Sequence, residues 1–206
     1  MNLIEDCPGT ATLTFLLAHG AGTAMDHPWL STVAAGLAQG GVRVVRFEFP
    51  YMARRRADGK NRPPDREAVL LDACREAYSA CGTGRIVVGG KSMGGRMASI
   101  VADELGAAGL VCLGYPFHPT GHPERTRVAH LEALRTPALI VQGTRDPFGL
   151  PRDVAGYTLS SSIFVDWIEG AGHDLVPSNT RKAPLGQSLE KPIANALAFL
   201  QELVRT

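Results

Sequence analysis

A serine between two glycines is the part of this sequence whose residue types and spacing most directly suggest chemistry. Residues 90–94 read Gly-Lys-Ser-Met-Gly; they follow a largely apolar run at 85–89 and precede a stretch, 95–102, that favours a helix. In a strand-to-helix turn this tight the serine is strained and its hydroxyl group is exposed, while side chains in place of the glycines would collide with neighbouring backbone. We therefore expect Ser92 to be a nucleophile, with an ordinary helix N-cap as the alternative interpretation.

A serine hydroxyl is a poor nucleophile at neutral pH and needs a base nearby. Two suitable side chains follow later strands: Asp146 comes just after the strand expected at 138–143, and His173 just after the one at 162–168. The histidine could take the proton of Ser92 and return it to a leaving group, and the aspartate could hold the imidazole in the required tautomer. The order Ser, Asp, His along the chain is the one that goes with a nucleophile on a strand–turn–helix.

These assignments have competitors. Asp146 precedes a proline and could be a plain turn residue. Asp153 and Asp166 are the competing acids, but Asp153 lies too far into the following helix and Asp166 lies inside a strand. His173 could be an ordinary loop histidine, although no other histidine follows the strand at 162–168. We therefore retain Asp146 and His173.

Acyl transfer at a serine also needs backbone N–H groups that bind the developing oxyanion. The turn that holds the serine aims the N–H of Met93 at a bound carbonyl oxygen. The second donor should come from the His-Gly-Ala-Gly loop at 19–22, which follows the apolar strand expected at 12–18. We expect this donor to be Ala21, with the next glycine close behind, and we expect the histidine of the loop to pack beneath it.

Further residues are candidates for substrate binding. Tyr51, Met52 and Phe117 are expected to form an apolar wall for an acyl group. Lys91, beside the nucleophile, either brings positive charge to the site or packs its stem along the sheet with its ammonium group in water, which is the interpretation we favour.

Five cationic side chains lie between residues 54 and 62, in the segment after the strand expected at 42–48. That segment belongs to the carboxyl ends of the strands, where α/β sheets bind ligands. An anionic substrate or partner is therefore possible, and a solvated loop whose charges aid solubility is the alternative. His118 and His122 are four residues apart, but prolines interrupt any helix between them, so we expect no metal site there.

The elements that must position these residues alternate between strands and helices, which predicts an α/β fold with a parallel sheet and helices on both faces. Strands are expected near 12–18, 42–48, 85–90, 109–114, 138–143 and 162–168, and helices near 28–39, 64–80, 93–105, 124–134, 151–159 and 190–204. Segments 50–64 and 115–123 should be irregular. No strand is expected before residue 12, and the segment 114–136 is too short for a lid, so the site should be open and shallow.

The 206 residues are expected to form a single domain, 1–206, and the net charge of +1 predicts no attraction to nucleic acid or membrane. The four cysteines have no paired spacing, which predicts reduced thiols. No secretory leader and no apolar membrane span is visible, so a cytoplasmic location is expected.

The serine segment, the His-Gly pair at 19–20, Asp146 and His173 together resemble the α/β-hydrolase superfamily over nearly the whole chain. The compact lidless plan is similar to that of dienelactone-hydrolase-like enzymes, which usually carry cysteine where this chain has Ser92. A smaller group, named after a testis-expressed protein and a subunit of a histone-acetyltransferase (NSL) complex, resembles the chain at 17–22, 47–52, 63–64 and 90–96.

The resemblance implies a minimal α/β-hydrolase fold and a serine hydrolase that cleaves ester or thioester bonds of small substrates through an acyl-enzyme, without a cofactor. Some relatives in the smaller group act in protein assemblies. A catalytically idle scaffold or binding module is therefore the alternative function.

Overall fold

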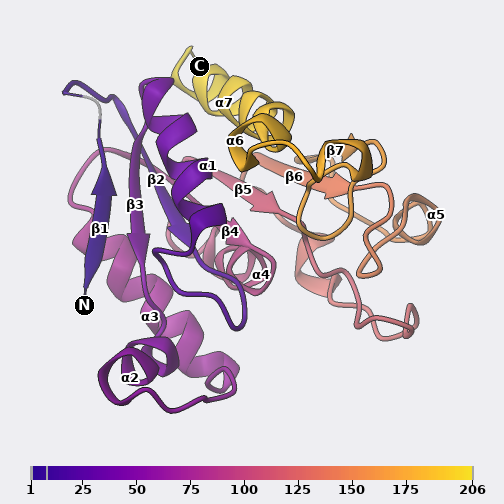
Figure 1. Cartoon of the computed structure of the whole chain (residues 1–206), viewed down its shortest axis with the longest axis horizontal. Helices are drawn as coiled ribbons and strands as arrows, with labels where there is room; N and C mark the ends of the chain where they lie inside the picture. Colours follow the sequence, from indigo (N-terminus) through magenta and orange to yellow (C-terminus); the bar gives the residue numbers. More distant parts are fainter. Residues whose placement is uncertain (1, 8, 206) are drawn as a thin grey trace.

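One seven-stranded sheet runs through the computed structural model, which describes residues 2–7 and 9–205, in the order β1-β3-β2-β4-β5-β6-β7 (Figure 1). Strands β2 to β7 are parallel to their neighbours, and β1 pairs antiparallel with β3. The strands are β1 (Leu3–Asp6), β2 (Leu13–Ala18), β3 (Arg43–Phe47), β4 (Arg85–Lys91), β5 (Gly109–Leu113), β6 (Ala138–Gly143) and β7 (Ile163–Ile168).

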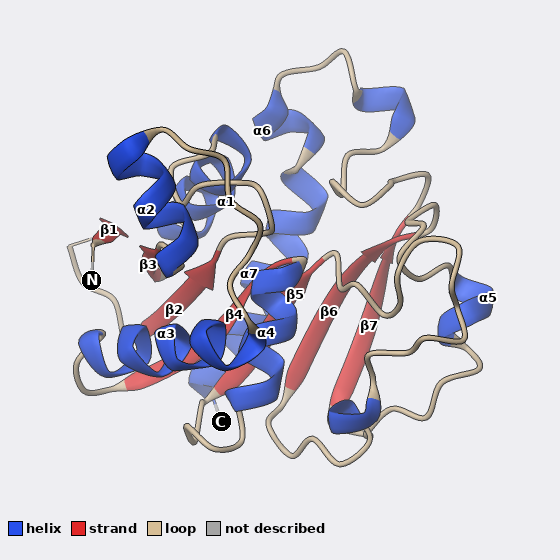
Figure 2. Ribbon diagram, turned by 90° about the horizontal axis from the view of Figure 1, so that it is seen from below, coloured by secondary structure: helices blue, strands red, loops and turns tan. Residues whose placement is uncertain are grey.

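Helices cover both faces of the sheet, α3 and α4 on one side and α1 and α7 on the other (Figure 2). Because side chains of a strand alternate between faces, Val88 packs with the α3 and α4 layer while its neighbour Val87 packs with α1 and α7. The helices are α1 (Pro28–Gln39), α2 (Pro50–Asp58), α3 (Glu67–Ala80), α4 (Met93–Val101), the 3-10 helix η1 (Ala129–Leu131), α5 (Pro151–Val154), the 3-10 helix η2 (Ser178–Thr180), α6 (Leu185–Ser188) and α7 (Glu190–Arg205).

The predicted α/β fold and the six predicted strands are confirmed, but the expectation that no strand precedes residue 12 is wrong. Strand β1 lies on the outer edge of β3, where Asp6 pairs with Arg46 at 2.8 Å and Glu5 pairs with Arg43 at 2.8 Å. Four residues that end in two acids carry no strand periodicity. The strand is stabilised by ion pairs with β3, which cannot be predicted from the sequence because they form only when the chain is folded.

Three predictions about helices are corrected. The segment 50–64, expected to be irregular, contains α2, because Pro50 suits the first turn of a helix and Gly59, at φ 72°, ends it in the left-handed conformation. The helix expected at 124–134 is only the short η1, and the one expected at 151–159 ends as α5 at Val154, where the next turns tighten to i→i−3 hydrogen bonds. Between β5 and β6 the chain forms only loops and the short η1, with no inserted lid.

Candidate active site

The turn between β4 and α4 holds Ser92 in a strained conformation, with φ 51° and ψ −114°. Its neighbouring glycines are required by close approach. A Cβ added at Gly90 would lie 2.5 Å from the carbonyl oxygen of Ala18, and one at Gly94 would lie 2.6 Å from the carbonyl oxygens of Ala18 and His19. The sequence pattern therefore reflects a steric need, as expected: β2 runs directly against this turn.

A continuous chain of hydrogen bonds joins the three residues expected to react together. The Ser92 hydroxyl lies 2.8 Å from Nε2 of His173, and Nδ1 of His173 lies 2.7 Å from Oδ2 of Asp146. Because a carboxylate oxygen can only accept, Nδ1 carries the imidazole proton and Nε2 is left to accept from the serine. The competing acids point elsewhere: Asp166 accepts from Asn195, and Asp153 accepts from the backbone N–H of Leu150.

Asp146 is fully buried and its carboxylate is held by further donors. The backbone N–H of Phe148 donates to Oδ1 at 2.9 Å, and the amide of Gln142 donates to Oδ2 at 2.9 Å. Gln142 is buried too and is itself fixed by hydrogen bonds to both backbone groups of Tyr115. This glutamine was not among the residues that we predicted. The available signal was an amide in an otherwise apolar strand, which must find buried partners.

The loop that carries His173 is fastened to the rest of the molecule through consecutive carbonyl groups. The Lys91 ammonium donates to the carbonyl oxygen of His173, and the indole N–H of Trp29 donates to that of Asp174 at 2.8 Å. Gly143 lets the loop cross close to β6, since a Cβ there would lie 2.3 Å from the carbonyl oxygen of Ala171. The imidazole is therefore placed by its own loop as well as by Asp146.

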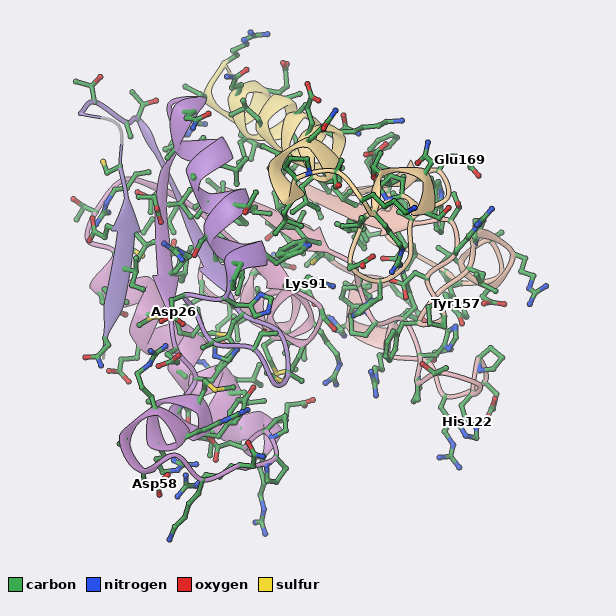
Figure 3. All side chains as sticks on the ribbon, viewed as in Figure 1. Asp26, Asp58, Lys91, His122, Tyr157 and Glu169 are labelled. Atoms are coloured by element: carbon green, nitrogen blue, oxygen red, sulfur yellow. The ribbon has the colours of Figure 1, made fainter. Side chains whose placement is uncertain are left out.

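Lys91 is not the hydrated side chain that we favoured from the sequence. Its Nζ lies 5.5 Å from the centre of the Trp29 ring, and burial lowers the pKa of the ammonium group to about 8, although Asp146 and Asp174 oppose this shift. Figure 3 shows Lys91 in the middle of the molecule. Its ammonium group is hydrogen-bonded to the loop that carries His173. Its aliphatic stem borders a cavity of about 180 Å³ that is also lined by His27 and Leu30.

The His-Gly-Ala-Gly loop after β2 is supported from below. His19 is fully buried; its Nε2 accepts from the N–H of Phe49 at 3.0 Å, and burial lowers the pKa of its imidazole. The neutral ring thus packs under the loop, as expected. Ala21 lies exposed at the turn, and Met93 is the first residue of α4, where an N–H has no acceptor within the helix.

The predicted apolar wall is corrected. Tyr51 and Phe117 are fully buried, so neither presents a surface to a substrate. The Tyr51 hydroxyl lies beneath the same loop and accepts from the N–H of Gly22 at 3.4 Å. Met52 does line a cavity, of about 480 Å³, next to Gly22. A residue that we did not predict, Phe148, packs its ring 4.5 Å from that of His173, measured between ring centres.

The cationic cluster at 54–62 is largely neutralised by acids from other segments. Arg56 pairs with Glu48 at 2.8 Å and Asp26 at 2.9 Å, and Arg54 pairs with Asp65. Within the segment, Arg62 pairs with Asp58. The sequence suggested a concentration of positive charge here, but three of the five cationic side chains form ion pairs with acids of the same protein.

Neither a metal centre nor a membrane helix is found in residues 2–7 and 9–205. Their His, Cys, Asp and Glu side chains form no group of three or more that could hold a metal ion. None of their helices combines the length and apolar character needed to cross a bilayer.

Comparisons with known proteins agree with this architecture. The chain resembles a dienelactone hydrolase from Anabaena variabilis with a TM-score of 0.73 and 21% identity, over 97% of this chain and 89% of that one. It resembles Est1E from Butyrivibrio proteoclasticus, solved with ferulic acid bound, with a TM-score of 0.72 and 16% identity, over 100% and 96% of the two chains. A lidless serine hydrolase from Xanthomonas campestris matches with a TM-score of 0.67 and 18% identity, over 98% and 87%.

At these identities the solved structures show the fold alone. The likeness to the smaller testis-expressed and NSL-subunit group stays a prediction. A family model described as an alpha/beta hydrolase domain matches residues 11–201, which is nearly the whole chain. The protein is therefore a member of the alpha/beta hydrolase family.

Proposed function

We propose that this protein is a serine hydrolase that cleaves carboxylic ester or thioester bonds of small substrates through a covalent acyl-enzyme. The observation that carries the proposal is the hydrogen-bonded chain from Asp146 through His173 to Ser92, with distances of 2.7 Å and 2.8 Å. A nucleophile, a base and a group that orients the base, each within hydrogen-bond reach of the next, form the arrangement that activates a serine.

In the first half-reaction the Ser92 oxygen bonds to the substrate carbonyl carbon while its proton passes to Nε2 of His173. The carbonyl oxygen becomes an oxyanion that accepts hydrogen bonds from the N–H groups of Met93 and Ala21, worth about 3–4 kcal/mol each to the barrier. The bond to the leaving oxygen or sulfur then breaks, and the leaving group receives the proton from Nε2. Asp146 stabilises the imidazolium while it exists.

In the second half-reaction a water molecule repeats the sequence. It gives a proton to Nε2 of His173 as its oxygen bonds to the acyl carbon, and Ser92 leaves with that proton. The product is a carboxylic acid, and the free serine is restored. The absence of a lid leaves the acyl group accessible to water at the carboxyl ends of the strands, and no step requires a cofactor.

The test is labelling with a fluorophosphonate probe together with hydrolysis of p-nitrophenyl acetate. Ser92→Ala should lose both. Ser99→Ala is a matched control, because Ser99 Oγ also lies 2.8 Å from a histidine nitrogen, Nε2 of His130, but that serine is buried. The control should keep both activities. Wild-type hydrolysis by Ser92→Ala would refute the nucleophile, and a wild-type protein that neither labels nor hydrolyses would make the fold an idle scaffold.

A further inference from the structure

A cavity of about 480 Å³ lies beside the predicted oxyanion loop. One wall is made by Gly22, Thr23 and Ala24, and the opposite wall by residues of α2, including Met52 and Arg55. The same loop borders the reactive turn, since a Cβ added at Gly20 would lie 3.4 Å from the carbonyl oxygen of Lys91. The loop at 20–24 therefore borders both the turn that carries Ser92 and the cavity.

Arg55 differs from its neighbours on α2 in both exposure and pairing. It follows the buried Tyr51 and Met52 by four and three residues, so it lies on the helix face that turns toward the sheet, and it is half-buried where Arg54 and Arg56 are exposed. Arg54 and Arg56 pair with carboxylates. Among the residues that the structure describes, no acid forms an ion pair with Arg55.

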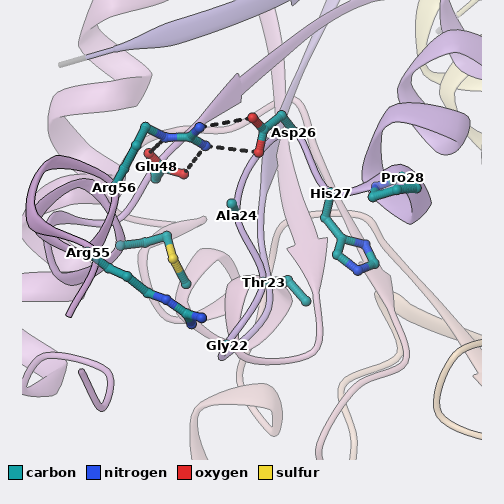
Figure 4. Close-up of a pocket in the computed structure, with 11 residues that line it drawn as sticks. Gly22, Thr23, Ala24, Asp26, His27, Pro28, Glu48, Arg55 and Arg56 are labelled. Carbon is teal, nitrogen blue, oxygen red and sulfur yellow. Dashed lines mark hydrogen bonds and ion pairs between the residues drawn. The ribbon is translucent and has the colours of Figure 1, made fainter. Parts of the chain in front are cut away.

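The two ends of the cavity carry different charges (Figure 4). At one end Arg56 is bound by both Asp26 and Glu48, a group with one net negative charge. At the other end the Arg55 side chain extends toward Gly22. A half-buried guanidinium without a counter-ion is a site for a carboxylate, which it can bind through two parallel hydrogen bonds. A dianion such as phosphate would be opposed by the two acids nearby.

We propose that this cavity is a substrate subsite in which Arg55 binds a carboxylate at the far end of the acyl chain. The preferred substrates are then esters or thioesters of short dicarboxylic acids, with one carboxyl group esterified and the other ionised. This inference rests on the proposed function for its catalytic meaning, but the binding of a carboxylate at Arg55 does not require Ser92 to react.

The kinetic test compares mono-p-nitrophenyl glutarate with p-nitrophenyl valerate, which differ by a terminal carboxylate in place of a methyl group. The wild type should favour the glutarate ester in kcat/KM by tenfold or more, mostly through KM. Arg55→Gln should abolish this preference, measured as the ratio of the two kcat/KM values within each protein. Arg54→Gln removes an adjacent but exposed, paired arginine and should keep it. Equal rates on both esters in the wild type would overturn the inference while leaving the hydrolase intact.

The binding test uses calorimetry with glutarate and with inorganic phosphate on the Ser92→Ala protein. Glutarate should bind, and the added change Arg55→Gln should weaken it at least tenfold, whereas Arg54→Gln should not. Phosphate binding as tight as that of glutarate would overturn the carboxylate assignment, and glutarate binding that ignores Arg55 would overturn the site. If glutarate binds through Arg55 but no ester is cleaved, the proposed function fails and the site stands.

Discussion

The charge state of Lys91 gives a prediction that can be worked out in free energy. Burial lowers the pKa of its ammonium group from 10.5 to about 8. The unfolded chain therefore holds this proton up to about pH 10.5, whereas the folded chain releases it near pH 8. Between those values the unfolded state binds more protons, so the stability contributed by this group rises with pH. A shift of about 2.5 pKa units corresponds to about 3.4 kcal/mol over the full range.

The perturbation is Lys91→Met, which keeps the stem and removes the titrating group. Any change with pH in the strength of the hydrogen bond from Lys91 to the His173 carbonyl is already contained in the shifted pKa of Lys91, and the other titrating groups are shared by both proteins. The wild-type free energy of unfolding, minus that of the variant, should therefore increase by about 2 kcal/mol between pH 7 and pH 9.5.

The assay is urea unfolding followed by far-UV circular dichroism at several pH values in this window. Whether the variant is more or less stable at pH 7 does not decide the matter, because desolvation and the lost hydrogen bond oppose each other there. A difference that stays constant with pH would refute the reasoning. It would mean that the ammonium is hydrated and is not seated between Trp29 and the His173 carbonyl.

Two other substitutions test the architecture of the site. Gln142→Leu removes a donor from the Asp146 carboxylate and leaves buried backbone groups unpaired, so it should lower kcat about tenfold with little change in KM and cost about 2 kcal/mol in denaturant unfolding; an unchanged kcat would show that Asp146 is positioned without it. Gly94→Ala drives a Cβ against the Ala18 carbonyl and should cost about 1–3 kcal/mol as well as activity. The control is Gly186→Ala, where the added Cβ would have nothing within 4 Å. Its free energy of unfolding, measured in the same denaturant experiment, should be close to that of the wild type.

Much of the fold could be predicted because its signals are local. A buried parallel sheet needs apolar runs, and those at residues 12–18, 85–90 and 138–143 could be found without tertiary information. Parallel strands bring their carboxyl ends to one edge of the sheet, so residues that follow β4, β6 and β7 could be expected to meet there. The hydrogen-bonded geometry expected for Ser92, Asp146 and His173 is present, while their roles remain a proposal.

What could not be predicted depends on contacts between distant segments. The arginines of α2 looked alike in sequence, but acids at Asp26 and Glu48 neutralise Arg56 and leave Arg55 unpaired. Tyr51 was expected to face a substrate, yet it is fully buried, and its hydroxyl contacts the loop after β2. The hydration of Lys91 likewise depends on an indole far away along the chain. Exposure and pairing of individual side chains are properties of the packed molecule.

The strained backbone of Ser92 has an evolutionary consequence. A residue other than glycine held at φ 51° and ψ −114° costs about 1–3 kcal/mol, which is a sizeable part of the stability of a small protein. A descendant in which the reaction no longer mattered would gain stability by replacing this serine with glycine. Selection for stability alone thus acts against this serine, and it is retained only where its hydroxyl group has a function.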